Sequence, residues 1–168
     1  VKVQFFFFLL NYSKTRFVMA FPFQKQEAWF EGHIQGFHFL CGVPRRITYD
    51  NLKTAVYRVL EGKKRQEQQA FKAFRSYYLC ESHYCTPAQA HEKGGVENDI
   101  GYAQRNFFSP IPEVDSFEEL NAYLHQACLQ DAQRRTRGQK ELVAQLWEAE
   151  KTFLLPLPAR DFPACTTR

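Results

Sequence analysis

Residues 1–21, VKVQFFFFLLNYSKTRFVMAF, contain two apolar runs that are separated by a short polar segment. The first run begins with alternation and then becomes apolar on both faces, which is typical of a strand in the middle of a sheet that is covered on both sides. Residues 11–14, NYSK, have the chemistry of a turn, and residues 15–21 have the pattern of a second strand. Because the gap between the two strands is short, the stretch predicts an antiparallel hairpin.

Beyond the hairpin, the spacing of apolar residues changes from that of strands to that of helices. Positions i, i+4, i+7 and i+11 of residues 24–40 predict one helical face, made of Phe30, Ile34, Phe37 and Cys41. We further expect a strand at 45–49, a helix at 66–78, a strand at 81–85, and helices at 94–108, 116–135 and 139–152. Ser116 and Glu119 have the spacing of a capping box. This order predicts an α/β fold with a mixed sheet flanked by helices, a class that includes the ribonuclease-H-like fold.

The composition of the 168 residues is that of a globular protein, with 45% hydrophobic and 16% aromatic residues. The apolar run at 5–10 is far shorter than the roughly 18 residues that a membrane-spanning helix needs. It has no signal-peptide pattern. Five cysteines, an odd number without secretory features, indicate reduced thiols and a cytoplasmic protein. The formal charge of +4 permits an anionic partner without requiring one.

Two carboxylates carry the chemical interpretation of the sequence. Asp50 lies just past the carboxyl end of the expected strand at 45–49, where α/β folds place their sites. Glu97 lies in the first turn of the expected helix at 94–108, where the helix dipole favours a carboxylate. Two converging carboxylates can hold magnesium, which takes oxygen ligands. The alternative is that Asp50 caps a turn and Glu97 only supports a helix N-terminus.

Two strings give these residues a family context: YDNLKTAV at 49–56 and KGGVENDIGYAQRNFF at 93–108. Both resemble the retroviral-integrase-like catalytic core of IstA-type insertion-sequence transposases. The hairpin stretch resembles the second and third core strands of that family, and LLPLPARDF at 154–162 resembles the run into its C-terminal region. The resemblance implies a DDE recombinase on a ribonuclease-H-like fold. Asp50 would then be the second catalytic Asp and Glu97 the catalytic Glu, both binding Mg²⁺ or Mn²⁺.

The chain departs from this family in one respect. The family has a first catalytic Asp on its first core strand, which would lie upstream of Val1, and no acidic residue occurs here before Glu27. We therefore expect a transposase fragment, truncated at its N-terminus, that is inactive or nearly so alone. Two alternatives stay open: a non-catalytic, decayed transposase remnant that retains DNA or protomer binding, and a nuclease of the same fold.

The resemblance also implies partners and an organisation. We expect Lys53, Lys93 and Arg105 to contact DNA phosphates, although a solvated basic surface is the alternative. The implied partners are transposon-end and target DNA, further protomers of the transposase, and an ATP-binding helper of the IstB type, with nucleoid association when DNA is bound. We expect a partial catalytic core at 1–112, a helical extension at 113–152 and a linker at 153–168.

Overall fold

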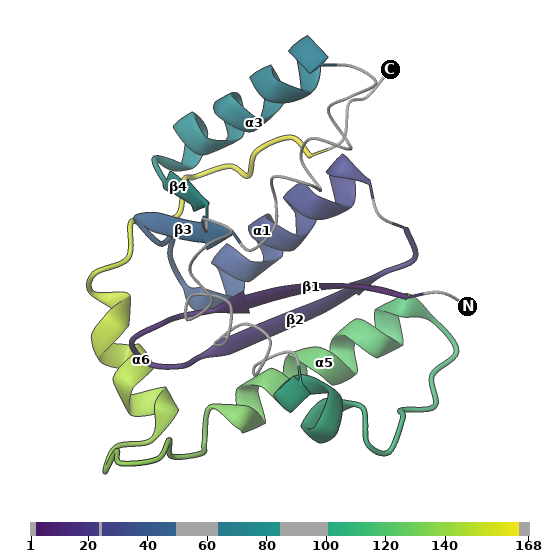
Figure 1. Cartoon of the computed structure of the whole chain (residues 1–168), viewed down its shortest axis with the longest axis vertical. Coiled ribbons are helices and arrows are strands. Elements are labelled where there is room, and N and C mark those ends of the chain that lie inside the picture. Colours follow the sequence, from purple (N-terminus) through teal and green to yellow (C-terminus); the bar gives the residue numbers. More distant parts are fainter. Residues whose placement is uncertain (1–2, 24, 50–63, 85–100, 165–168) are drawn as a thin grey trace.

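A computed structural model describes residues 3–23, 25–49, 64–84 and 101–164 of the chain. Its elements, in chain order, are β1 (Gln4–Leu9), β2 (Arg16–Phe21), α1 (Gln26–Leu40), β3 (Arg46–Tyr49), α3 (Lys64–Tyr78), β4 (Glu81–Tyr84), a helical segment at 101–107, α5 (Phe117–Asp131) and α6 (Val143–Lys151). Helices lie on both sides of the hairpin formed by β1 and β2 (Figure 1). No helix in the described ranges is long and apolar enough to span a membrane.

The hairpin predicted from residues 1–21 is confirmed. Strand β1 pairs antiparallel with β2, in a register that runs from Gln4 opposite Phe21 to Leu9 opposite Arg16. The turn closes with a 2.9 Å hydrogen bond from the backbone N–H of Leu10 to the carbonyl of Thr15. Alternate residues of β1 point to opposite faces, which sends Phe6 and Phe8 toward α1 and Phe5 toward Phe108.

Helix α1 approaches β1 closely because it carries glycine at two positions one turn apart. A Cβ atom at Gly32 would lie 2.5 Å from Cγ of Phe6, and a Cβ atom at Gly36 would lie 2.5 Å from Cδ2 of Phe8. Both distances are shorter than carbon atoms tolerate. The glycines therefore let two phenylalanine rings of the strand pack directly against the backbone of the helix.

We expect Gly36→Ala to lower the free energy of unfolding by about 1–2 kcal/mol. Overpacking of a core costs about 1–3 kcal/mol. The higher helix propensity of alanine offsets up to about 1 kcal/mol of this cost. Urea denaturation measures the difference. The matched control is Gln35→Ala on the exposed side of the same helix, and an equal effect of both substitutions would contradict the close packing.

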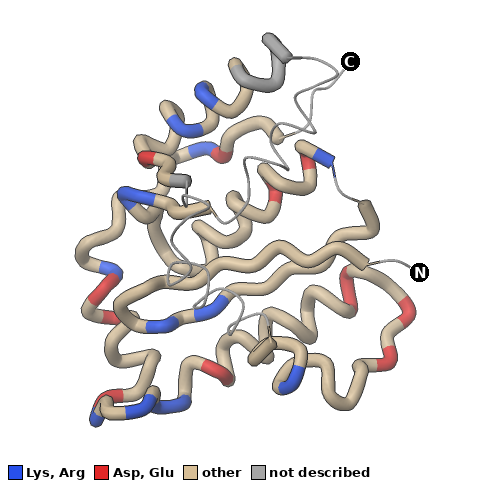
Figure 2. The backbone as a smooth tube through the Cα atoms, viewed as in Figure 1, with Lys and Arg blue, Asp and Glu red and all other residues tan. Residues whose placement is uncertain are grey.

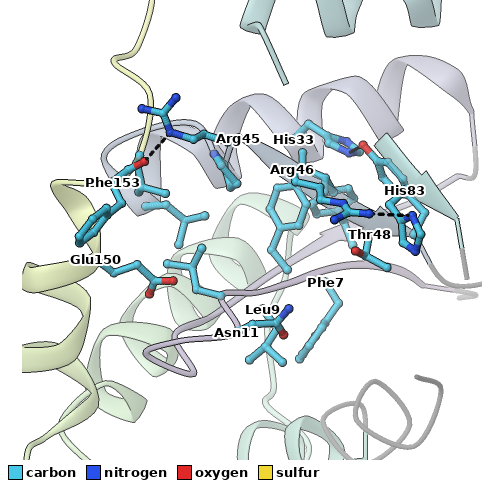
Figure 3. A pocket seen from close by; sticks show the side chains of 18 of the residues that line it. Phe7, Leu9, Asn11, His33, Arg45, Arg46, Thr48, His83, Glu150 and Phe153 are labelled. Atoms are coloured by element: carbon cyan, nitrogen blue, oxygen red, sulfur yellow. Dashed lines mark hydrogen bonds between the residues drawn. The ribbon is translucent and has the colours of Figure 1, made fainter. Parts of the chain in front are cut away.

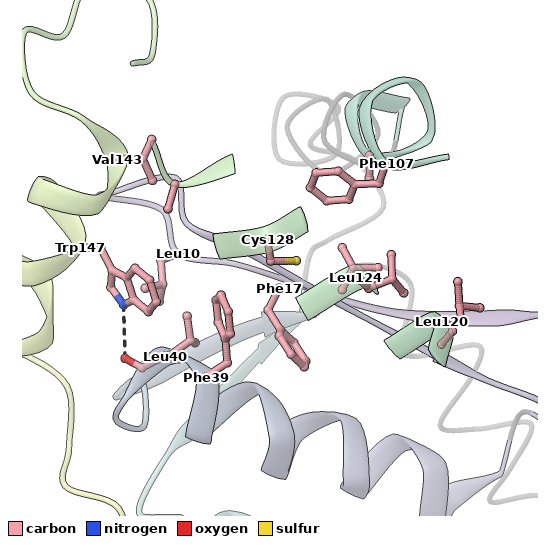
Figure 4. Packing of buried hydrophobic residues seen from close by; sticks show 14 residues of the cluster. Leu10, Phe17, Phe39, Leu40, Phe107, Leu120, Leu124, Cys128, Val143 and Trp147 are labelled. Atoms are coloured by element: carbon pink, nitrogen blue, oxygen red, sulfur yellow. Dashed lines mark hydrogen bonds between the residues drawn. The ribbon is translucent and has the colours of Figure 1, made fainter. Parts of the chain in front are cut away.

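Helix α5 covers the face of the hairpin opposite α1. Leu120, Leu124 and Cys128 of this helix are buried against the hairpin (Figure 4). The side chain of Asn121 accepts a hydrogen bond from the N–H of Ala20 at 2.7 Å and donates one to its carbonyl at 3.0 Å. A side chain of α5 therefore satisfies backbone groups on the outer edge of β2.

A second cluster of buried residues lies on the other side of α1. Strands β3 and β4 pair in parallel there, and Phe30, Phe37 and Phe74 pack together between α1 and α3. The segment 153–164, which was expected to be a linker, runs past this cluster: Leu155 forms a bridge with Val43, and Phe162 contacts the ring of Phe74. The division of the chain into three parts stays a prediction.

Several expectations need correction. Cys41 is not on the buried face of α1, because the helix ends at Leu40 and Cys41 is an exposed left-handed cap with φ of 63°. The helix expected at 116–135 ends at Asp131, and the helix expected from residue 139 begins at Val143. The hydroxyl of Ser116 accepts a hydrogen bond from the backbone N–H of Glu119, as a capping box requires. The Glu119 carboxylate, however, accepts from the backbone N–H of Asp115 and not from that of Ser116. The four described strands form two separate two-stranded sheets instead of one mixed sheet.

Candidate functional site

Four of the five predicted site residues lie outside the described ranges: Asp50, Lys53, Lys93 and Glu97. Their roles stay predictions. Asp50 directly follows Tyr49, the last residue of β3. The structure therefore describes the strand that leads to the predicted metal ligand, as far as Tyr49.

The carboxyl end of β3 is held from the interior of the protein. Tyr49 is buried, and its hydroxyl lies 3.0 Å from Nε2 of His33 in α1. Nδ1 of His33 lies 2.7 Å from the carbonyl oxygen of Trp29. Because a carbonyl only accepts, Nδ1 carries the proton, and Nε2 of the neutral ring accepts from the tyrosine hydroxyl. The backbone just before Asp50 is thus tied to α1 through two side chains.

Sequence reasoning missed His33. Its side chain is fully buried, and burial lowers the pKa of its imidazole from 6.5 to about 3. The rings of Trp29, Phe6 and Phe8 surround it, with centroids at 4.0, 4.8 and 5.0 Å. One signal in the sequence could have indicated it. His33 stands next to Ile34 in a helix with an apolar buried face, and a buried histidine requires a hydrogen-bond partner inside the protein.

The depressed pKa of His33 predicts a loss of stability in acid. Below pH 6.5 the unfolded chain binds a proton on this residue that the folded chain excludes until the pH approaches 3. The free energy of unfolding should therefore fall by about 2 kcal/mol between pH 7 and pH 5 from this residue alone. Urea denaturation at both pH values of the parent and of His33→Phe measures this contribution.

The expected result is that His33→Phe loses most of this pH dependence, whatever its stability at pH 7. The control is His125→Gln, which replaces an exposed histidine and should keep the dependence of the parent. An identical slope in the parent and in His33→Phe would contradict a buried neutral imidazole.

A second arrangement fixes the helical segment 101–107, which carries Arg105. The carboxylate of Asp131 accepts from the hydroxyl of Tyr102 at 2.7 Å, and it pairs with Arg16 at 3.4 Å and Arg134 at 3.1 Å. The guanidinium of Arg16 also lies 3.8 Å from the centroid of the Tyr102 ring. The Asp131 side chain is only 4% exposed, so this network joins β2, α5 and the helical segment.

Sequence reasoning also missed this network, although the sequence contains a signal for each of its two charged members. Asp131 continues the buried spacing of Leu120, Leu124 and Cys128 by one more turn, and Arg16 stands in an otherwise apolar strand. A buried acid and a buried base on adjoining elements are an expected pair. The arginine at 134 lies beyond α5 and binds Asp131, instead of forming part of the helix end as expected.

Arg105 is the one predicted site residue within the described ranges, and its side chain is exposed. Its Nη1 lies 3.2 Å from the point where a Cβ atom at Gly101 would be. The guanidinium therefore lies over the space beside this glycine. An exposed guanidinium held on an anchored helix is suited to contact a phosphate group.

Comparison with known proteins shows to which proteins this chain is related. A transposase of Aminobacter aminovorans is 36% identical over 148 residues, which are 88% of this chain and 29% of that protein. The transposase for insertion sequence element IS21 of Pseudomonas aeruginosa is 32% identical over 169 residues, which are 96% of this chain and 41% of that protein. This chain is related to the insertion-sequence transposases. The relationship that the sequence motifs predicted is confirmed.

Other comparisons define how far this relationship extends. The transposase for insertion sequences IS1326/IS1353 of Pseudomonas aeruginosa is 36% identical over 128 residues, 76% of this chain and 25% of that protein. The chain thus spans about a quarter to two fifths of the length of these transposases. No protein-family model matches the chain.

A solved structure shares the fold. A chain of the simian T-cell lymphotropic virus intasome, determined in complex with PP2A regulatory subunit B56 gamma, has a TM-score of 0.65 and 16% sequence identity. The likeness covers 99% of this chain and 54% of that chain. The α/β arrangement of this chain is therefore also found in a chain of that complex.

Proposed function

We propose that the chain is part of the catalytic core of a DDE transposase, on a ribonuclease-H-like fold, which cleaves DNA strands and transfers them in the intact protein. The observation that carries this proposal is the relationship to insertion-sequence transposases along most of the chain. The fold shared with a chain of a retroviral intasome complex is consistent with it.

In this proposal Asp50 and Glu97 bind Mg²⁺ or Mn²⁺. Carboxylate oxygens are the ligands that both ions take in phosphoryl-transfer sites, so the donor chemistry fits. Asp50 continues from a strand end that the His33–Tyr49 hydrogen bond fixes. In the described ranges no group of three or more His, Cys, Asp or Glu residues could hold a metal, so the proposal depends on these two carboxylates. Bound metal would supply Lewis-acid stabilisation of the phosphate and of the leaving oxygen.

The chain supplies two carboxylates to this site, and we propose that the intact protein supplies a further one. With two of the three carboxylates, the site places less negative charge and fewer fixed ligands around a divalent ion than the complete site would. The 168 residues alone should therefore show little or no strand transfer. The intact protein would act as an oligomer on paired transposon ends and would use an ATP-binding helper of the IstB type.

Lys53, Lys93 and Arg105 are the proposed DNA contacts. Lysine and arginine positions are spread along the described backbone, from β2 and β3 to α3 and α6 (Figure 2). The proposal therefore rests on their place in the sequence: Lys53 is close to Asp50, and Lys93 and Arg105 flank Glu97. Contacts of this kind are with phosphates and carry no base specificity.

We expect Arg105→Ala to weaken binding to a duplex of arbitrary sequence and to reduce the slope of log affinity against log salt by about one. Fluorescence anisotropy over a series of salt concentrations measures both effects. The control, Arg160→Ala, removes the same charge from an exposed position in the C-terminal segment and should leave the slope unchanged. Equal effects of the two substitutions would indicate a general charge effect and no contact at Arg105.

The experiment that tests the proposed function is a replacement in a relative. Residues of the Aminobacter aminovorans transposase that align with this chain are exchanged for the corresponding residues of this chain, and transposition is measured in cells. Transposition by the chimera would support a catalytic role of this segment. A chimera that is folded and binds transposon ends but does not transpose would favour the non-catalytic alternative.

A further inference from the structure

Strand β3 has one apolar face and one polar face. Ile47 and Tyr49 are buried in the cluster of residues that lies between α1 and α3. Because successive side chains of a strand point to opposite faces, Arg46 and Thr48 lie on the other face, where both are exposed. The exposed face of this strand therefore presents a guanidinium and a hydroxyl group side by side.

The neighbouring strand β4 adds a histidine to this polar face. The hydroxyl of Ser82 accepts a 2.7 Å hydrogen bond from Nη1 of Arg75 in α3, so Ser82 points to the helix side of the strand. His83 therefore points to the opposite side, and the parallel register places it beside Thr48. The side chains of Arg46, Thr48 and His83 line the same pocket and lie near one another (Figure 3).

A hydrogen bond between two of these side chains fixes where their protons lie. Nη2 of Arg46 lies 3.1 Å from Nδ1 of His83. A guanidinium only donates, so Nδ1 accepts and the neutral imidazole carries its proton on Nε2. The Nε2–H of His83, the remaining N–H groups of Arg46 and the hydroxyl of Thr48 make no hydrogen bond to any residue that the structure describes. The three side chains thus offer a set of donors that an acceptor from outside the chain can use.

The charge of Arg46 is not compensated within the described part of the chain. Glu81 is its register partner on β4 and is exposed, yet the guanidinium donates to the neutral ring of His83 and forms no ion pair with a described residue. One positive charge beside two neutral donors is complementary to an anion that has one negative charge and several oxygen acceptors. A phosphodiester is an anion of this kind.

We propose that Arg46, Thr48 and His83 bind a backbone phosphate of DNA. Arg46 supplies the charge, while Thr48 and His83 donate neutral hydrogen bonds to the phosphate oxygens. Strand β3 leads to the predicted metal ligand Asp50, so the three residues are positioning residues that hold DNA beside the proposed catalytic centre. The choice of DNA rests on the proposed function, whereas the donor set rests on the described side chains alone.

The test measures binding of the whole chain to a short DNA duplex of arbitrary sequence, by fluorescence anisotropy over a series of salt concentrations. Arg46→Gln removes the charge and Thr48→Val removes the hydroxyl. His83→Leu removes both ring nitrogens, whereas His83→Gln keeps an oxygen that accepts from Arg46 and an N–H that donates. The matched control is Arg45→Gln, which removes the same charge one residue earlier, where the guanidinium already donates to the carbonyl of Phe153 at 3.3 Å.

We expect Arg46→Gln to weaken duplex binding about tenfold and to reduce the slope of log affinity against log salt by about one. Thr48→Val and His83→Leu should each weaken binding about threefold and leave the slope unchanged, because they remove neutral donors. His83→Gln should stay within about twofold of the parent. Arg45→Gln should leave the slope unchanged, because its guanidinium is not part of the donor set.

Three results would overturn the inference: a parent chain that does not bind the duplex, an unchanged slope in Arg46→Gln, or an equal effect of Arg45→Gln. Inorganic phosphate, added as a competitor, separates the two sources of a phosphate group. Displacement of the duplex at an equal concentration of phosphate groups would show a site for the free anion and would also overturn binding to DNA. None of these measurements depends on transposition, so failure of this site is distinguishable from failure of the proposed function.

Discussion

Asp50→Asn and Glu97→Gln should each reduce transposition by about a thousandfold or more in an intact transposase that contains these 168 residues. Each substitution keeps the size of the side chain and removes a charged metal ligand. Metal stabilisation of a phosphoryl transition state contributes several kcal/mol, and about 1.4 kcal/mol corresponds to a tenfold change in rate. Transposition frequency in cells measures the effect.

Matched controls are available a short distance along the chain. Asp115→Asn and Glu113→Gln remove carboxylates from exposed positions and should change transposition less than tenfold. Thermal unfolding of the four variants checks that the protein still folds. If Asp50→Asn or Glu97→Gln retained activity within tenfold of the parent, the corresponding residue would not be a catalytic metal ligand.

Phe74→Ala should lower the free energy of unfolding by about 3–5 kcal/mol, the usual cost of deleting a buried aromatic ring. Phe74 is 0% exposed and stacks against Phe30 with ring centroids 4.8 Å apart. Its ring also lies 5.3 Å from that of Phe162 in the C-terminal segment. The substitution therefore removes contacts between α1, α3 and residues far along the chain.

Urea denaturation measures this loss, and Ile111→Ala is its control. Ile111 is 81% exposed, so its truncation should change stability by less than about 0.5 kcal/mol. A cost for Phe74→Ala of below 1 kcal/mol would contradict the packing of α3 and the C-terminal segment on α1.

The sequence predicted the elements of this fold better than their assembly. Apolar periodicity located the hairpin, α1, α3 and α5, because each buries one face and repeats with its own period. Helix ends were less predictable. Leu40 ends α1 through a left-handed cap at a cysteine, which has no strong sequence signature. The C-terminal segment resembled a linker because its prolines prevent regular structure, although Leu155 and Phe162 pack on the core.

The candidate site shows the same limit. Motifs led to Asp50 and Glu97, because their types and their places relative to a strand and a helix indicate metal chemistry. His33 and Asp131 were not found, because their roles depend on partners at 49 and at 16 and 102, which only the tertiary structure brings near. Supporting residues of this kind come from several elements, and no local pattern marks them.

The most direct test of the central claim, that Asp50 and Glu97 form one metal site, is calorimetric titration of Mn²⁺ and Mg²⁺. The proteins are the 168-residue chain, Asp50→Asn and Glu97→Gln, each checked for folding by circular dichroism. The account predicts measurable Mn²⁺ binding by the parent that each substitution weakens at least tenfold, because each removes one of two shared ligands. Metal binding that is equal in all three proteins would contradict the claim.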